Sequence, residues 1–78
     1  MSMVKIILPE LGEGIEKATV ACWHRHVGEK VSFDEDIVEV VTDKASFNVS
    51  THQEGILKEI LVPEGKDAKV GEALAVIE

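Results

Sequence analysis

The sequence predicts an all-β fold: a flattened β-barrel or sandwich of two four-stranded antiparallel sheets related by a pseudo-twofold axis. Three observations support this prediction. Short apolar runs alternate with glycine, proline and acidic residues at the spacing typical of β-sandwiches and barrels. No window of about 11 residues carries the i, i+3, i+4, i+7 apolar stripe of an amphipathic helix. The order of strands and turns also repeats along the chain.

Turn-forming residues mark the ends of the first three expected strands. The run 4–8 stops at Pro9, and an acidic loop rich in glycine follows it. The run 18–27 ends at Gly28, and a brief strand is expected at 31–33. Proline lacks the amide that a strand ladder needs, and glycine adopts tight-turn conformations, so the three runs are expected to form separate strands.

The other five expected strands cover residues 37–42, 46–51, 55–62, 68–70 and 74–78. A tight turn at Asp43 and Lys44 separates the first two of them. The apolar residues of 55–62 would also fit one face of a helix. Gly55 at its start and Pro63 just after it leave too little room for a helix, so a strand is expected.

An internal repeat underlies the predicted symmetry. When the chain is shifted by 37 residues, Gly28 falls on Gly65. In the same register, apolar positions match as follows: Val20 with Leu57, Trp23 with Ile60, Val31 with Ala68, Phe33 with Val70, Ile37 with Leu74, Val38 with Ala75 and Val40 with Ile77. The first strands of the two halves match only if the first half carries about five extra residues, the loop 11–15. Two similar halves would then pack as two sheets over one core.

Alternating apolar residues predict that the strands on either side of Asp43 and Lys44 pair as a hairpin. The residues expected to be buried, there and elsewhere, are Val38, Val40, Phe47, Val49, Leu57, Ala75 and Ile77. This register leaves Asp43 and Lys44 at the tip, the length of a two-residue hairpin loop. Lysine is not a favoured turn residue, which suggests a function for it, although a lysine at a polar tip is most often simply solvated.

Length and charge narrow the classes of function. The 78 residues suffice for a single domain, 1–78. With 15 acidic against 8 basic side chains, the net charge of −7 disfavours nucleic-acid and membrane partners. No apolar stretch approaches the roughly 20 residues that span a bilayer, and the start lacks the pattern of a signal peptide, so a cytoplasmic or organelle-matrix protein is expected. The lone Cys22 can form no internal disulfide, and no metal site is expected around it.

The chemistry of a tip lysine is that of a primary amine. Such an amine can accept an activated carboxylic acid and form a stable amide. The neutral amine is the reactive form, and an exposed lysine has a pKa of about 10.4, so a modifying enzyme must supply both the activated acyl group and the base. The domain would contribute one lysine held in a fixed orientation. No nucleophile, base and orienting group lie at a recognisable spacing, so no catalytic residue is expected.

Three segments resemble the lipoyl domains of 2-oxo acid dehydrogenase complexes. The segment 8–15, LPELGEGI, resembles the N-terminal signature of that family, and 42–45, TDKA, resembles its lysine-bearing turn. Residues 60–65 and 70–77 are similar to its closing half. The resemblance covers essentially the whole chain, in order.

The resemblance implies that Lys44 takes lipoate on its side-chain nitrogen, attached by a lipoate ligase or a lipoyl/octanoyl transferase. It implies a non-catalytic carrier domain that belongs to a longer acyltransferase chain and is itself monomeric. The implied partners are a thiamine-diphosphate-dependent 2-oxo acid dehydrogenase, an acyltransferase core and dihydrolipoamide dehydrogenase. The residues expected to serve recognition are Thr42, Asp43 and Ala45 beside the lysine, and Gly12, Glu13 and Gly14 of the acidic loop.

Some positions depart from the family pattern. Val41 stands where an acidic residue is frequent, which could alter the choice of partner. The segment 50–54 replaces a more apolar connection that contains proline. The segment 22–26, CWHRH, is interpreted as a polar, exposed strand face, with Cys22 as a small packing residue. No role is assigned to His52.

Other carriers and other classes remain as alternatives. A biotin carrier domain resembles the same fold, but such domains flank their lysine with methionines, whereas Asp43 and Ala45 flank Lys44 here. A glycine-cleavage carrier protein would be longer and would carry helices. An unmodified interaction module of the same fold would have no need of a lysine at the tip.

Overall fold

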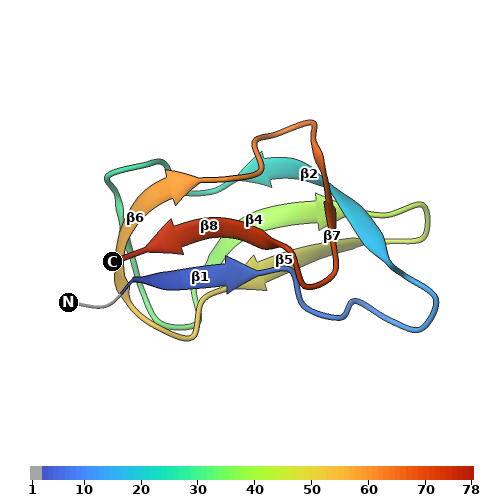
Figure 1. Ribbon diagram of the computed structural model, residues 1–78, viewed down its shortest axis with the longest axis horizontal. Helices are drawn as coiled ribbons and strands as arrows, with labels where there is room; N and C mark the ends of the chain where they lie inside the picture. The colour runs from blue at the N-terminus through green and yellow to red at the C-terminus, as the bar shows by residue number, and fades with distance from the viewer. Residues whose placement is uncertain (1–2) are drawn as a thin grey trace.

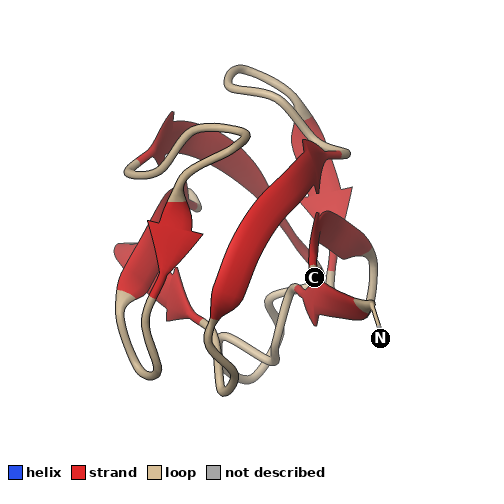
Figure 2. Cartoon of the chain, turned by 90° about the vertical axis from the view of Figure 1, so that its left-hand side faces the viewer, coloured by secondary structure: helices blue, strands red, loops and turns tan. Residues whose placement is uncertain are grey.

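The computed structural model describes residues 3–78 as eight β-strands in two antiparallel sheets (Figure 1). The strands are β1 (Val4–Ile7), β2 (Lys17–Trp23), β3 (Lys30–Val31), β4 (Asp36–Val41), β5 (Ser46–Ser50), β6 (Gly55–Ile60), β7 (Asp67–Lys69) and β8 (Ala73–Ile77). One sheet has the order β1-β8-β6-β3 and the other β5-β4-β2-β7. Seen along the long axis, the sheets curl around a shared core (Figure 2). Residues 3–78 contain no helix long and apolar enough to cross a membrane. The predicted all-β architecture is confirmed.

The two sheets are equivalent under the predicted shift of 37 residues. Val20 pairs with Val40 between β2 and β4, and the shifted residues, Leu57 and Ile77, pair between β6 and β8. Strands β7 and β3 occupy equivalent sheet edges. Ala18 of β2 pairs with Ala68 of β7, and the residues equivalent to them, Gly55 of β6 and Val31 of β3, also pair with each other. The internal repeat read from the sequence is therefore a structural repeat.

The extra length in the first half is six residues, not about five. Val4 pairs with Ile77 as Phe47 pairs with Val40, so Val4 corresponds to Phe47, 43 residues later. The predicted five extra residues would align Val4 with Ser46, one residue too early. Alternation alone cannot set this offset, since the first strands are short and the loop between β1 and β2 is longer than its counterpart between β5 and β6.

Matching β-bulges interrupt both sheets. Ile37 is an extra residue in β4 where this strand pairs with β5, and Leu74 is the equivalent extra residue in β8 where it pairs with β1. A bulge breaks the two-residue alternation, so consecutive side chains can face the same way. Ile37 and Val38 are accordingly both fully buried, as are Leu74 and Ala75. The bulges thus add two large side chains to the core that strict alternation would direct outward.

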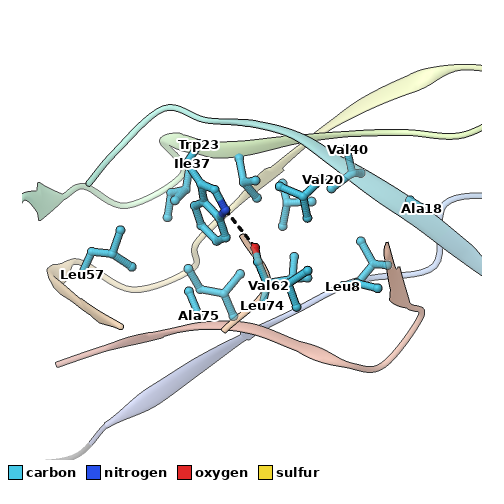
Figure 3. Packing of buried hydrophobic residues seen from close by; sticks show 14 of the residues in the cluster. Leu8, Ala18, Val20, Trp23, Ile37, Val40, Leu57, Val62, Leu74 and Ala75 are labelled. Carbon is cyan, nitrogen blue, oxygen red and sulfur yellow. Dashed lines mark hydrogen bonds between the residues drawn. The ribbon is translucent and has the colours of Figure 1, made fainter. Parts of the chain in front are cut away.

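The core is built almost entirely from aliphatic residues, with one indole (Figure 3). Six of the seven residues expected to be buried are buried: Val38, Val40, Val49, Leu57, Ala75 and Ile77. Phe47 is only half-buried and packs against the edge of this core, since β5 lies at the edge of its sheet. Trp23 of β2 reaches the segment that follows β6, where its Nε1 donates a hydrogen bond to the carbonyl oxygen of Val62 at 3.0 Å.

Two strand predictions need correction near the turns that follow β2 and β3. The strand expected over 31–33 is β3, which ends at Val31. The Phe33 side chain is 61% exposed, whereas its repeat partner Val70 is half-buried against the core. The turn after β3 contains Asp34 with a φ of 61°, a left-handed conformation that carries the chain away from the sheet. Strand β2 likewise ends at Trp23, four residues before the expected boundary, because a loop begins at His24.

We expect Gly55→Ala to destabilise the domain by about 1–3 kcal/mol, the usual cost of an extra carbon in a packed site. A Cβ at Gly55 would lie 2.7 Å from the carbonyl oxygen of Glu78 and 2.7 Å from Ile77 Cγ2, so the end of β8 would have to move. Urea unfolding followed by circular dichroism measures the change, with Glu54→Ala at the exposed neighbouring position as the control. An unchanged unfolding midpoint would show that β8 can shift freely.

Candidate functional site

The β4–β5 hairpin presents Lys44 at one end of the molecule. Val41 pairs with Ser46, and Thr42 N donates to the carbonyl oxygen of Ala45 at 2.8 Å, which leaves Asp43 and Lys44 as the tip. The tip lies at the opposite end of the long axis from the start of β1 and the end of β8 (Figure 1). The predicted position of the lysine at a hairpin tip is confirmed.

The hydroxyl of Thr42 organises the tip. Its Oγ1 accepts hydrogen bonds from the backbone amides of Lys44 and Ala45, each at 3.1 Å. The same hydroxyl donates to the carbonyl oxygen of Ala45 at 3.1 Å. Thr42 is half-buried, whereas Asp43, Lys44 and Ala45 are exposed. The backbone that bears the lysine is therefore tied down, while the lysine side chain stays accessible.

The acidic loop between β1 and β2 lies beside the hairpin and forms one wall of a surface groove. Gly12, Glu13 and Gly14 line this groove together with Thr42, Asp43 and Lys44. Gly14 has a φ of 82°, a conformation that side chains disfavour, and Ile15 N closes the turn by donating to the carbonyl oxygen of Gly12 at 3.2 Å. The structure thus brings five of the six expected recognition residues to one groove with the lysine. Ala45, the sixth, lies at the tip but outside the groove lining.

Strand β7 and the residue after it also line the groove, although the sequence did not assign them to the site. The lining residues are Asp67, Lys69 and Val70, and Thr19 Oγ1 donates to Asp67 Oδ1 at 2.6 Å. Strand β7 reaches the site because it pairs with β2. A signal was available in the sequence repeat, which predicts that 68–70 is an edge strand like 31–33, but the repeat alone does not say which edge adjoins the tip.

The groove is predominantly acidic. Its charged lining residues are Glu10, Glu13, Glu16, Asp43 and Asp67 against Lys17, Lys44 and Lys69. A surface with five acidic and three basic side chains favours partners whose docking surface is basic or mixed in charge.

The segment 22–26 lies outside this site, and its interpretation as an exposed polar strand face is wrong. Trp23 is buried, and the following residues form a loop that an ion pair fastens to the β3–β4 turn. Arg25 donates to Glu35 from Nε, at 3.3 Å, and from a terminal nitrogen, and these bonds hold the pKa of Glu35 below its usual value. Cys22 is half-buried.

Histidines and acidic residues of the described chain do not gather into a metal site. Among residues 3–78, no group of three or more histidine, cysteine, aspartate or glutamate side chains could hold an ion. His52 lies 3.6 Å from Asp34 in an exposed pair that joins the β3–β4 and β5–β6 turns. What this site offers chemically is the exposed primary amine of Lys44 at the tip of an ordered hairpin, beside an acidic groove.

Comparisons with known proteins agree on a family. A model of the family described as biotin-requiring enzyme, which groups biotin- and lipoyl-type domains, matches residues 4–77. The solution structure of the lipoyl domain of the 2-oxoglutarate dehydrogenase complex from Azotobacter vinelandii is 37% identical, with a TM-score of 0.76, and the match covers 96% of this chain and 95% of that one.

Two full-length proteins with matching segments carry the same description, the dihydrolipoyllysine-residue succinyltransferase component of the 2-oxoglutarate dehydrogenase complex. The Staphylococcus saprophyticus protein is 41% identical over 96% of this chain, and the Escherichia coli K12 protein is 45% identical over 83%. The matched segments make up 18% and 16% of those proteins, respectively. The chain therefore corresponds to less than a fifth of either relative.

Proposed function

Because this chain belongs to the biotin/lipoyl domain family, and within it to the lipoyl domains, we propose that it carries lipoate as an amide on Nζ of Lys44. The observation that carries the proposal is the placement of one exposed lysine at the tip of an ordered hairpin. The residues present fit such a group, since the Nζ is free to form an amide and nothing needs to be displaced. Bound there, lipoate supplies a dithiolane that accepts an acyl group with reduction and releases it to coenzyme A.

The chain's own contribution is presentation and recognition. The hairpin ladder and the Thr42 hydroxyl fix the backbone of the tip, so the tethered group moves within a limited volume around it. Tethering keeps a high effective concentration of the group at each partner site in turn. The Gly12–Gly14 loop and Asp43 provide the surface that partner enzymes recognise next to the lysine. The domain itself performs no catalytic step.

The parent assembly is proposed to be a 2-oxoglutarate dehydrogenase complex, in which the cargo is a succinyl group. The relatives from three organisms carry this name in their descriptions, which supports the assignment. The proposed partners are then the thiamine-diphosphate-dependent dehydrogenase that loads the carrier, the succinyltransferase core that unloads it, and dihydrolipoamide dehydrogenase, which reoxidises it.

Intact-protein mass spectrometry after enzymatic modification tests the attachment. We expect one lipoyl adduct when the chain is incubated with lipoate, ATP and a lipoate ligase, and none with biotin and a biotin ligase. Peptide mapping should place the adduct on Lys44, with the six other lysines of the chain as internal controls. A biotin adduct, a lipoyl group on another lysine, or an unmodified folded chain would each contradict the proposal.

A further inference from the structure

The tip of the β4–β5 hairpin does not have the backbone conformation that two-residue loops usually adopt. Such loops favour type I′ or II′ turns, which need a positive φ at one or both central residues. Among residues 3–78, Asp34 is the sole non-glycine residue with a positive φ, so Asp43 and Lys44 both have negative values. A turn of that kind tends to splay the flanking strands, because its twist opposes theirs. The tip therefore needs additional interactions to stay closed.

The Thr42 side chain supplies those interactions. In this turn the amides of Lys44 and Ala45 both donate to Thr42 Oγ1, at 3.1 Å. The hydroxyl proton faces the carbonyl oxygen of Ala45, also at 3.1 Å, and Thr42 N donates to the same oxygen at 2.8 Å. A hydroxyl has one proton and two lone pairs, so these three bonds use its full capacity. One side chain thus fixes the backbone at Lys44 itself and at the residue after it.

We propose that Thr42 is a positioning residue for the modification of Lys44: its hydroxyl holds the tip in the conformation from which the modifying enzyme takes the lysine. This inference rests on the proposed function. It also revises the role that the sequence suggested for Thr42, since the hydroxyl acts through the backbone of the tip and not by contact with a partner.

Removal of the hydroxyl at constant shape tests the inference. Thr42→Val keeps the branched side chain and leaves both amides without their acceptor. We expect kcat/KM for lipoyl transfer to Lys44 to fall by about tenfold, the loss expected for one net hydrogen bond or slightly more. Amide exchange at Lys44 and Ala45, followed by NMR, should become faster in the same variant. Thr42→Ser retains the hydroxyl and should restore both the rate and the slow exchange.

The chain contains a matched control at its other end. Thr51 makes a similar but smaller set of bonds: its Oγ1 accepts from one amide, Gln53 N, at 3.1 Å and donates to the carbonyl oxygen of Gln53 at 2.8 Å. It follows β5 and lies roughly 20 Å from the tip along the strand direction. Thr51→Val therefore removes a hydroxyl that also bonds the backbone of a turn, but far from the tip, and we expect lipoyl transfer to Lys44 to continue at the wild-type rate.

The possible outcomes separate this inference from the proposed function. If the wild type takes no lipoate, the function itself is wrong. If the wild type is modified and Thr42→Val is modified equally fast, the positioning role is wrong while the function stands. A raised KM with unchanged amide exchange would mean that the modifying enzyme contacts Thr42 directly, which also overturns the positioning role. An equal loss of rate in Thr51→Val would attribute the effect to general destabilisation.

Discussion

The Lys44→Arg chain is expected to fold like the wild type and to accept no lipoate. Lys44 is exposed and lies outside the core, so its replacement removes no packing. The arginine keeps the positive charge, but its pKa lies so far above neutral pH that no neutral nitrogen is left to attack an activated acyl group. Intact mass spectrometry after incubation with the ligase should show the unmodified mass, and the variant should accept no succinyl group from the dehydrogenase.

Lys66→Arg is the control for this experiment. Lys66 is exposed and also lies in a tight turn, where its amide donates to the carbonyl oxygen of Pro63 at 3.1 Å. The Lys66→Arg variant should take lipoate on Lys44 as the wild type does. Any lipoyl adduct on the Lys44→Arg chain would show that another lysine serves as the attachment site.

The sequence predicts the hairpin and its tip correctly because alternation is strict there. Val38 and Val40 lie on either side of a polar residue, Val49 continues the pattern on the next strand, and the pairing follows from placing these three side chains on the same face. A shift of one residue would have turned all of them to solvent, so the register is strongly determined. The position of Lys44 then follows from the loop length alone.

The β-bulges and the turn after β3 could not be predicted from alternation in the same way. The bulges at Ile37 and Leu74 leave no mark in composition, since an apolar residue next to another apolar residue also fits a regular strand. The exposure of Phe33 follows from the left-handed turn at Asp34, a conformation that sequence disfavours but does not forbid. The bulges and the exposure of Phe33 were both missed because they depend on local backbone geometry.

The site was predictable in its central residue and incomplete in its surroundings. The lysine and the acidic loop stand out as motifs, and the groove joins them. The contribution of Asp67 depends on which strand pairs with β2, and the function of the Thr42 hydroxyl depends on a turn conformation that dipeptide preferences would not favour. Contacts of these two kinds arise from the assembled fold.

Trp23→Ala is expected to reduce the free energy of unfolding by about 3–5 kcal/mol, the usual range for removing a large aromatic side chain from a core. Trp23 of β2 is 6% exposed and its indole reaches the carbonyl oxygen of Val62, in the segment after β6 (Figure 3). A domain of 78 residues has a small core from which to compensate. Folded domains have unfolding free energies of about 5–15 kcal/mol. If that of the wild type lies near ~5 kcal/mol, the variant should be partly unfolded without denaturant. Urea titration followed by far-ultraviolet circular dichroism measures the loss, since the only tryptophan is gone.

Trp23→Phe separates the two contributions that Trp23→Ala combines. Phenylalanine fills much of the same volume but cannot donate to the carbonyl oxygen of Val62, which then has no partner from this side chain. An unsatisfied buried carbonyl costs about 1–3 kcal/mol, so the phenylalanine variant should lose less stability than the alanine variant but clearly more than zero. Equal losses in the two variants would mean that the hydrogen bond accounts for the stability of this region. A loss near zero for Trp23→Phe would mean that packing alone holds the two sheets together at this position.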